Sequence, residues 1–335
     1  MTRGTKPWCS TEVRYVDCSH INNNWMKTKI LIVDDIHEIM LEKFEQAGIP
    51  YDYQPAISRE EAEKIIPNYS GMVIRSKFQV DEAFFDLAPN LRFIARAGAG
   101  MDNIDDTIAA QRGVLLIPAN EGNRDAVGEH MIGMLLSLMN NLNRGDQQIR
   151  SGRWLREANR GYELKGRTVG LIGYGHNGMA MAKKLSGFDV HVLAYDKYRT
   201  DYTDQYAEAA AMEKIYQEAD VISFHIPLTD ETRGMIDADY LAKFEKPIFF
   251  LLGARGAIVQ VPAVLDRLDS GAILGAAFDV LPVEKFPKLA EQTWYKNLTQ
   301  RDNVILSPHV AGWTFESYYK LSEVAADKII AFLAS

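Results

Sequence analysis

The sequence predicts an α/β protein with two doubly wound parallel-sheet domains, one inserted into the other. Three observations predict this fold class. Short apolar segments alternate with helix-like segments through most of the chain, a glycine-rich turn lies at mid-chain, and the last segment is a helix pattern with no strand after it. Alternating strands and helices favour parallel sheets covered by helices. A chain of 335 residues is long enough for two domains with full cores.

The amino-acid composition argues against several classes of protein function. A hydrophobic content of 47% and a charged content of 24% are ordinary for a globular protein. The net charge of -8 disfavours nucleic acid or an anionic membrane as a partner. The longest apolar runs, such as residues 131–139, are too short to span a membrane. Both cysteines, Cys9 and Cys18, lie near the N-terminus, so the rest of the chain has no disulfide framework, which fits a reducing cytoplasm.

Residues 1–25 are polar and lack the apolar core of a signal peptide. The pattern becomes typical of a folded protein at Met26, so we expect Met26 to be the natural start and residues 1–25 to be an N-terminal extension without a catalytic role. A metal site at Cys9 and Cys18 is the alternative. Their spacing is not a familiar ligand pattern, and no metal is expected.

The first half of the chain predicts a sheet with covering helices. Residues 124–142 form a long, largely apolar helix pattern with no strand directly after it, so we expect this helix to cross between domains. The polar segment 145–166 contains Trp154 among several arginines, residue types enriched at interfaces, and is expected to be a surface arm or subunit contact. The other expected elements are strands at 29–33, 71–75, 91–96 and 114–117 and helices at 37–47 and 81–87.

The most informative segment reads strand, glycine turn, helix, strand and carboxylate. Gly173, Gly175 and Gly178 form G-x-G-x-x-G, and Asp196 ends the second strand. The first glycine allows a tight turn, the second lets the backbone approach a pyrophosphate, and the third lets the helix pack on the strand. The helix N-terminus offers free N–H groups to phosphates, and a carboxylate in the place of Asp196 can accept hydrogen bonds from a ribose diol. The segment predicts dinucleotide binding; a glycine-rich turn of another α/β protein, such as a methyltransferase, is the alternative. Its parts are a strand at 169–172, a helix at 179–185 and a strand at 190–195.

The remaining segments continue the alternation to the C-terminus. The closing amphipathic pattern at 314–333 has no strand after it, so we expect this helix to return and pack on the first domain. The expected boundaries are therefore 26–122 with 308–335 for the substrate domain and 123–307 for the inserted NAD-binding domain. The other elements are strands at 221–225, 247–251, 272–277 and 303–306 and helices at 207–218, 238–244 and 261–268.

Three polar residues follow predicted strands downstream of the glycine turn: Arg255, Glu284 and His309. The carboxyl ends of strands face the ligand crevice in doubly wound sheets, so these residues can converge there. Reduction of a 2-keto acid needs a hydride donor, a proton donor and a cation for the carboxylate. Imidazole titrates near neutrality, a carboxylate beside it raises its pKa, and guanidinium binds a carboxylate through two hydrogen bonds. Taken singly, each residue has an alternative as a loop histidine, a solvated acid or a surface charge.

The sequence resembles the D-isomer-specific 2-hydroxyacid dehydrogenases over residues 27–333, especially the phosphoglycerate dehydrogenase branch. Several separate motifs in the right order carry this resemblance. They are RAGAGMDNID at 96–105, the glycine turn, HIPLT at 225–229, GARG at 253–256, FDVLPVE at 278–284 and SPHVAGWT at 307–314.

The resemblance implies a Rossmann NAD-binding domain inserted into a discontinuous flavodoxin-like substrate domain. It implies that His309 is the acid/base, Glu284 its partner, and Arg255 the residue that binds and polarises the substrate. The reaction is then hydride transfer between nicotinamide and C2 of a small 2-hydroxy or 2-keto acid. D-3-phosphoglycerate is the first expectation for the substrate. The alternatives are a glyoxylate or hydroxypyruvate reductase and a non-catalytic NAD(H)-sensing corepressor-like protein.

The candidate site residues fall into two sets. Asp279 is expected near the nicotinamide carboxamide, with a plain strand-end cap as the alternative, and a structural role is the alternative for His225. Arg75, Lys77 and Arg124 are the candidates for a phosphate, although Arg124 also fits a solvated charge at the start of a helix. The expected cofactor-binding residues are Gly173, Gly175, His176, Asn177, Gly178, Asp196, His225, Pro227, Thr232, Gly253, Ala254, Asp279 and His309. The expected substrate-binding residues are Arg75, Ser76, Ala97, Gly98, Ala99, Gly100 and Arg255.

The sequence also departs from the family's usual motifs. Leu252 and Gly253 stand where Asn-Thr or Asn-Ser is usual, and Lys285 stands where proline often follows the glutamate. Asp196 favours NAD over NADP because a carboxylate repels a 2′-phosphate, whereas Lys197 and Arg199 close behind it weaken that preference. The resemblance implies a homodimer. It also implies no feedback through the C-terminal regulatory domain of longer phosphoglycerate dehydrogenases, since the chain ends at Ser335.

Overall fold

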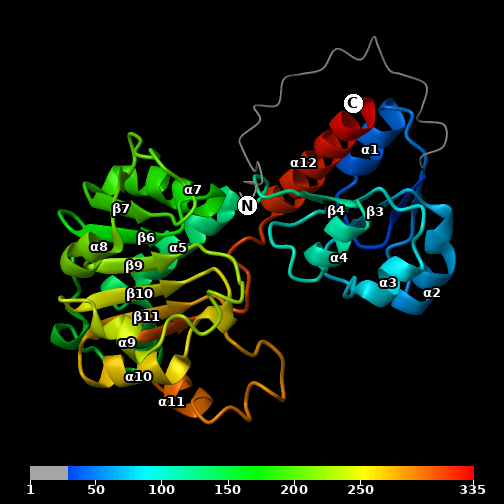
Figure 1. The fold of residues 1–335 in the computed structure, drawn as a ribbon. Helices are drawn as coiled ribbons and strands as arrows, with labels where there is room; N and C mark the ends of the chain where they lie inside the picture. The colour runs from blue at the N-terminus through cyan, green and yellow to red at the C-terminus, as the bar shows by residue number, and fades with distance from the viewer. Residues whose placement is uncertain (1–28) are drawn as a thin grey trace.

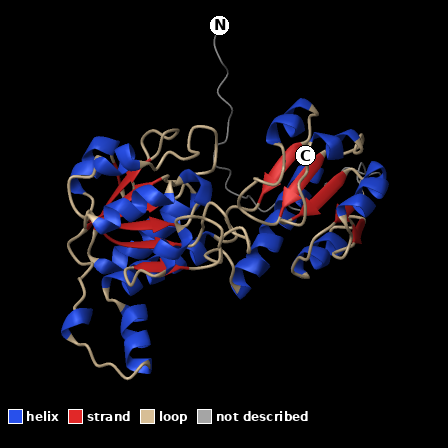
Figure 2. Ribbon diagram, turned by 90° about the horizontal axis from the view of Figure 1, so that it is seen from below, coloured by secondary structure: helices blue, strands red, loops and turns tan. Residues whose placement is uncertain are grey.

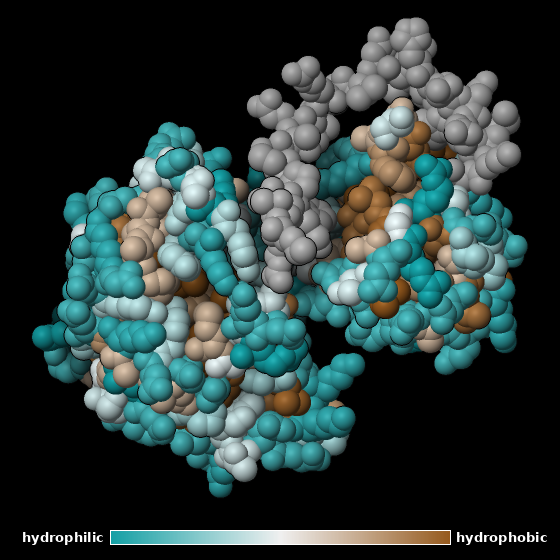
Figure 3. Space-filling model, in the orientation of Figure 1, coloured by the Kyte–Doolittle hydropathy of each residue, from teal (hydrophilic) through white to brown (hydrophobic). Residues whose placement is uncertain are grey.

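The computed structural model describes residues 29–335. The predictions for Cys9, Cys18 and Met26 concern residues outside the described part of the chain. The described residues form two lobes, each with a parallel sheet between layers of helices (Figures 1 and 2). In the space-filling view, the lobes meet at a narrow waist and most of the visible surface is hydrophilic (Figure 3). The predicted fold class is confirmed.

The first lobe has a five-stranded sheet in the order β2-β1-β3-β4-β5, which is the flavodoxin-like order. All neighbouring strands run parallel. Strand β3 (Gly71–Ile74) is buried along its whole length, as expected for a strand with helices on both faces. The other elements are β1 (Ile30–Ile32), α1 (Ile39–Gln46), β2 (Tyr51–Tyr53), α2 (Arg59–Ile65), α3 (Glu82–Asp86), β4 (Phe93–Arg96), α4 (Asp106–Gln111) and β5 (Leu115–Pro118).

The second lobe has a seven-stranded parallel sheet in the order β12-β11-β10-β9-β6-β7-β8. The strand order reverses between β6 (Thr168–Ile172) and β9 (Val221–Phe224), and ligands of such sheets bind in the crevice at this point. The other strands are β7 (His191–Tyr195), β8 (Glu208–Ala209), β10 (Ile248–Leu252), β11 (Ile273–Phe278) and β12 (Val304–Leu306). The helices are α7 (His176–Leu185), α8 (Met212–Glu218), α9 (Ala238–Ala242), α10 (Val261–Asp269) and α11 (Tyr295–Thr299).

The C-terminal helix α12 (Phe315–Ala334) returns to the first lobe and lies beside α1 (Figure 1). Its buried face shares one apolar core with strands β1 and β4. Lys43 of α1 and Asp327 of α12 form an ion pair of 2.7 Å at the edge of this contact. The predicted return of this helix to the first domain is confirmed.

Helix α5 (Arg124–Met139) packs on α7 of the second lobe. The prediction of one helix over 124–142 is wrong at its end. Asn141 has a left-handed backbone (φ 54°), and a new helix, α6 (Leu142–Arg150), starts after it. The predicted arm at 145–166 is therefore helical as far as Arg150. The domain boundaries at 122/123 and 307/308 stay predictions.

Several short elements have no counterpart in the sequence-based prediction. Strand β2 has the sequence YDY and is half-buried throughout, so it lacks a continuous apolar run. The helix expected at 207–218 starts only at Met212, because Glu208 and Ala209 form the edge strand β8. Helices α2, α4 and α11 were also not predicted. Within residues 29–335, every helix is too short or too polar to cross a bilayer.

Candidate active site

The glycine turn joins β6 to α7 and has the geometry that a pyrophosphate requires. Gly173 has a φ of +95°, which favours glycine. A Cβ at Gly178 would lie 2.2 Å from the carbonyl oxygen of Gly173, whereas a Cβ at Gly175 would meet nothing within 4 Å. The third glycine is thus required for packing, and the second leaves open space beside the start of α7. The turn fits the phosphates of a dinucleotide.

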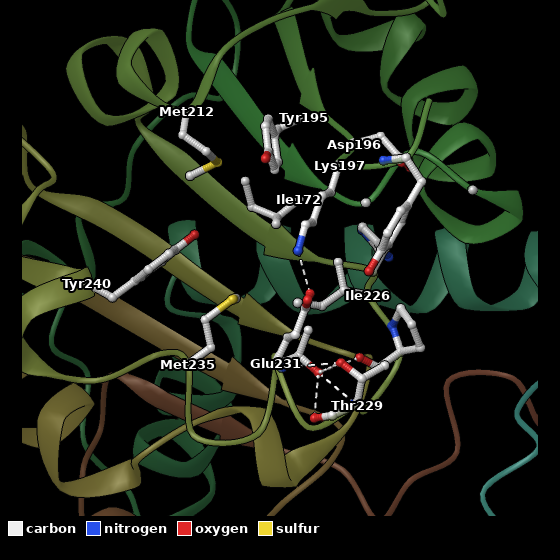
Figure 4. Close-up of a pocket in the computed structure, with 16 residues that line it drawn as sticks. Ile172, Tyr195, Asp196, Lys197, Met212, Ile226, Thr229, Glu231, Met235 and Tyr240 are labelled. Carbon is white, nitrogen blue, oxygen red and sulfur yellow. Dashed lines mark hydrogen bonds and ion pairs between the residues drawn. The ribbon is translucent and has the colours of Figure 1, made fainter. Parts of the chain in front are cut away.

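A pocket lies at the carboxyl ends of β6, β7 and β9, where the adenosine half of the cofactor is expected, and we call it the adenosine pocket (Figure 4). Asp196 at its rim is fixed in place by two backbone N–H groups, since Oδ2 accepts from Tyr174 at 2.9 Å and Oδ1 from Tyr198 at 3.0 Å. The walls are largely apolar, with Met212, Met235 and aromatic rings, as adenine requires. Six of the predicted cofactor residues line this pocket: Gly173, Gly175, Asp196, His225, Pro227 and Thr232.

His225 is held in the neutral form. Its Nε2 lies 3.0 Å from Oγ of Ser223, and burial lowers its pKa to about 4. A neutral imidazole adds no charge to the adenosine pocket, so His225 contributes shape and hydrogen bonding there.

A second cavity lies between the two lobes and collects residues from distant parts of the chain. One wall comes from the loops after β3 and β4, and the opposite wall from the loops after β10, β11 and β12. All seven predicted substrate residues line it, together with Asn177, Gly253, Asp279 and His309. The structure therefore brings most of the predicted catalytic and substrate residues into one cleft.

His309 and Glu284 form a pair at this cleft. Nδ1 of His309 lies 3.0 Å from Oε2 of Glu284, so Nδ1–H donates to the carboxylate and Nε2 is left for a substrate. The hydrogen bond to Glu284 raises the pKa of His309, against the opposing effect of partial burial. His309 also has a left-handed backbone with a φ of 56°. The geometry suits a proton donor whose charged form is favoured by the carboxylate beside it.

The glutamine variant Glu284→Gln tests this pair. Reduction needs the protonated imidazole, so the rate falls as pH rises through the pKa of His309. Because Glu284 raises that pKa, the fall in the variant is expected at a lower pH than in the unmodified chain. A pH–rate profile of keto-acid reduction measures it. Glu208→Gln is the matched control, since Glu208 pairs with His191 at 3.1 Å on an exposed edge; an identical shift in both variants would contradict the assignment.

Asp279 supports the loop that carries His309. Its Oδ1 accepts from Oγ of Ser307 at 2.6 Å and from the N–H of Val310 at 2.9 Å, and its Oδ2 accepts from the N–H of Ala311 at 2.9 Å. The side chain is 1% exposed. These bonds match the strand-end cap that was the alternative to a nicotinamide contact. Nε2 of His130, on α5, extends the network at 2.9 Å from Oγ of Ser307.

Arg255 is held across the cleft by a residue of the other lobe. Its Nε and Nη2 donate to Oδ2 of Asp102 at 2.9 and 2.6 Å. Arg96 lies behind this pair and donates to the backbone oxygens of Arg75 and Gly100. Burial, with repulsion from Arg255 and Arg75, lowers the pKa of Arg96 to about 10. A second guanidinium close to Arg255 therefore enhances the positive charge of the cleft.

Four predicted site residues line neither cavity: His176, Gly178, Ala254 and Glu284. His176 is the first residue of α7, and its Nδ1 has no partner among the described residues. The carbonyl of Ala254 accepts from Nη1 of Arg255 at 2.7 Å, so Ala254 acts through that arginine. Gly253 lines the cleft without a side chain because a Cβ there would lie 2.4 Å from Sδ of Met131.

Sequence reasoning missed several residues of the cleft. Arg96 and Asp102 line it, and both belong to the RAGAGMDNID motif, so the sequence did carry a signal for them. Trp313 lies in the SPHVAGWT motif, and the guanidinium of Arg75 stacks over its ring at 4.2 Å. Asn123 also lines the cleft, and no motif pointed to it.

Comparison with known proteins identifies the fold and the family. The sequence model of "D-isomer specific 2-hydroxyacid dehydrogenase, NAD binding domain" matches residues 132–311. The chain is 32% identical over 304 residues to D-3-phosphoglycerate dehydrogenase of Archaeoglobus fulgidus, covering 90% of this chain and 56% of that protein. It is 35% identical over 289 residues to glyoxylate reductase of Thermofilum pendens, covering 84% of this chain and 83% of that protein.

A solved structure confirms the architecture over nearly the whole chain. The glyoxylate reductase from Paecilomyes thermophila superimposes with a TM-score of 0.81 at 19% identity, covering 92% of this chain and 95% of that chain. The family assignment from the sequence model is consistent with the two parallel-sheet lobes and with the glycine turn. The chain is an NAD-dependent oxidoreductase that belongs to the D-isomer-specific 2-hydroxyacid dehydrogenase family.

Proposed function

We propose that the chain is a D-3-phosphoglycerate dehydrogenase, which interconverts a phosphorylated 2-hydroxy acid and its 2-keto acid in the cleft between the lobes. The observation that carries the choice of substrate is the set of guanidinium groups in that cleft. Arg75, Arg96 and Arg255 line it against two acids: Asp102, which pairs with Arg255, and Asp279, whose oxygens accept from Ser307 and from backbone N–H groups. A substrate with a carboxylate and a phosphate fits this excess of positive charge better than a monoanion does.

The reaction would need three groups: a hydride donor, a cation that binds the carboxylate and a proton donor. NADH, held by the glycine turn and Asp196, would supply the hydride that adds to C2, and the carbonyl oxygen would then take up the bonding pair and a proton. Arg255 would hold the substrate carboxylate with the N–H groups of its guanidinium that are not bonded to Asp102 or Ala254. Nε2 of His309 gives its proton to the carbonyl oxygen, while Glu284 keeps Nδ1 in place. In the direction of oxidation, neutral His309 takes the proton from the hydroxyl.

The phosphate position is best matched by Arg75. Its guanidinium stacks over Trp313 at 4.2 Å and over Tyr318 at 5.4 Å, which fixes its direction at the mouth of the cleft. Nη1 of Arg75 donates to the backbone oxygen of Asp35 at 3.1 Å, which leaves its other N–H groups for a phosphate. Lys77 does not line the cleft, and its Nζ donates to the backbone oxygens of Val33 and Pro55. Arg124 does not line the cleft.

A panel of 2-keto acids with NADH tests this proposal. We expect kcat/KM for phosphohydroxypyruvate to exceed that for hydroxypyruvate by at least about tenfold, since one charge-assisted hydrogen bond is worth about 1.5–3 kcal/mol. The panel also contains glyoxylate and pyruvate. A preference for glyoxylate or hydroxypyruvate would contradict the phosphate assignment in favour of a reductase of small keto acids. Tight NADH binding without turnover of any keto acid would favour the NAD(H)-sensing alternative.

The proposed assembly is a homodimer. Apolar side chains gather along α6 and the segment after it, and they are exposed: Leu142, Ile149, Trp154, Leu155 and Tyr162. Trp154 is 83% exposed, and an exposed patch of this kind favours burial against a second copy. Light scattering of the purified chain is expected to give twice its mass of 37.7 kDa.

The cytoplasmic location also stays a prediction.

A further inference from the structure

Two cations directly follow the carboxylate that favours NAD. In nucleotide sites of this kind, a basic side chain close to the strand-end acid can accommodate a 2′-phosphate. Lys197 is the next residue after Asp196, and it lines the same pocket. A free ammonium at this position would offset the repulsion by Asp196, so its surroundings decide between the two cofactors.

Arg199 does not occupy that position. Its guanidinium donates to the carbonyl of Tyr174 and lies 5.9 Å and 5.7 Å from the ring centroids of Tyr174 and Tyr202. It does not line the adenosine pocket. Lys197 is therefore the cation that matters at the 2′-position.

Lys197 is engaged by an acid from the opposite wall. Its Nζ forms an ion pair with Oε2 of Glu231, which lies in the loop between β9 and α9. Figure 4 shows this pair reaching across the mouth of the pocket. Glu231 also lines the pocket, so its wall carries two carboxylates, Asp196 and Glu231, and Glu231 is the one that pairs with the ammonium of Lys197.

We propose that Glu231 is a specificity-determining residue that excludes NADP by holding and neutralising Lys197. With Lys197 paired, the net charge near the ribose 2′-position is negative, which repels a 2′-phosphate and leaves a ribose diol unaffected. The inference rests on NAD as the cofactor and is independent of the substrate, so a failure of the substrate panel leaves it standing.

Removing the charge of Glu231 is expected to change the affinity for a 2′-phosphorylated ligand by a factor of a few. Lys197 and Glu231 are 55% and 62% exposed at their side chains, and exposed ion pairs are weak and screened by salt. Removal of the Glu231 charge acts twice, since it removes a repulsion and releases an attracting ammonium. The affinity for a 2′-phosphorylated ligand is expected to rise about threefold to tenfold at low salt in the Glu231→Gln variant.

The test is the binding of ADP-ribose and 2′-phospho-ADP-ribose to the full chain by calorimetry. In Glu231→Gln, the dissociation constant of 2′-phospho-ADP-ribose is expected to fall about threefold to tenfold, while that of ADP-ribose changes less than about twofold. Adding Lys197→Met to this variant is expected to remove the gain. High salt is expected to reduce the gain as well.

Glu163→Gln is the matched control for the change in net charge. Glu163 is exposed, and among residues 29–335 its carboxylate forms no ion pair, although its backbone oxygen accepts from Nε of Arg167. An equal gain in Glu163→Gln, a gain that persists without Lys197, or an equal tightening of both ligands in Glu231→Gln would overturn the proposal. Loss of ADP-ribose binding in Glu231→Gln would also overturn it, because Glu231 would then be needed for the pocket itself. Failure of the unmodified chain to bind ADP-ribose would instead overturn the location of the cofactor site.

Discussion

Replacing His309 by asparagine is expected to lower kcat for keto-acid reduction by about a hundredfold to ten-thousandfold. His309 is the titratable group at the cleft that combines a raised pKa with a nitrogen free to face the substrate. Asparagine cannot supply that proton. It tolerates the left-handed backbone that His309 adopts (φ 56°), so the loop is expected to keep its shape.

Two measurements separate chemistry from folding in this variant. The dissociation constant for NADH is expected to stay within about threefold of that of the unmodified chain, because His309 does not line the adenosine pocket. His191→Asn is the matched control, since His191 also pairs with a glutamate but is exposed at the start of β7, away from both cavities. Undiminished turnover in His309→Asn, or an equal loss in His191→Asn, would show that His309 is not the acid/base.

The parts of the fold that the sequence predicted are those with strong local patterns. The segment 169–196 combines an apolar strand, three spaced glycines and a second strand, and each of these constraints is local in the chain. The close approach of Gly178 to the carbonyl of Gly173 explains why the pattern is so specific. Half-buried or very short elements such as β2 and β8 lack such a pattern, so the sequence did not predict them.

The break after α5 shows that hydrophobic periodicity did not predict where this helix ends. Residues 124–142 keep a helical pattern of apolar side chains, and the chain nevertheless turns at Asn141. Asparagine tolerates a left-handed backbone, and this conformation at Asn141 ends α5 and turns the chain into α6. Periodicity alone does not specify such an end.

The sequence did not predict which residues far apart in the chain would pair with each other. Asp102 and Arg255 are separated by 153 positions and belong to different lobes, and only the folded chain brings them together. Glu231 carries no motif, and its role depends on the position of Lys197 across the pocket. Asp279 was identified as a site residue, but its partners are backbone N–H groups that no sequence pattern reveals.

The variant Arg255→Lys is expected to lower kcat/KM for the keto acid by about thirtyfold to a thousandfold. Arg255 and the substrate carboxylate would form a charge pair, and truncating one partner of such a pair costs about 2–5 kcal/mol. The lower part of this range applies because the substitution keeps the positive charge. Lysine keeps the charge of Arg255 but loses the planar pair of N–H donors that fits a carboxylate. The substitution is therefore expected to weaken the binding of the substrate and also to impair its orientation for hydride transfer.

Steady-state kinetics that separate KM from kcat test the role of Arg255. Both parameters are expected to worsen, because the guanidinium binds the carboxylate and also faces the cleft that holds His309. The control is Arg167→Lys, in which a guanidinium that pairs with Asp220 at 3.8 Å away from the cleft is changed in the same way. Unchanged kcat/KM in Arg255→Lys would mean that charge alone suffices. Arg96, the half-buried neighbour that lines the same cleft, would then be the group that orients the substrate carboxylate.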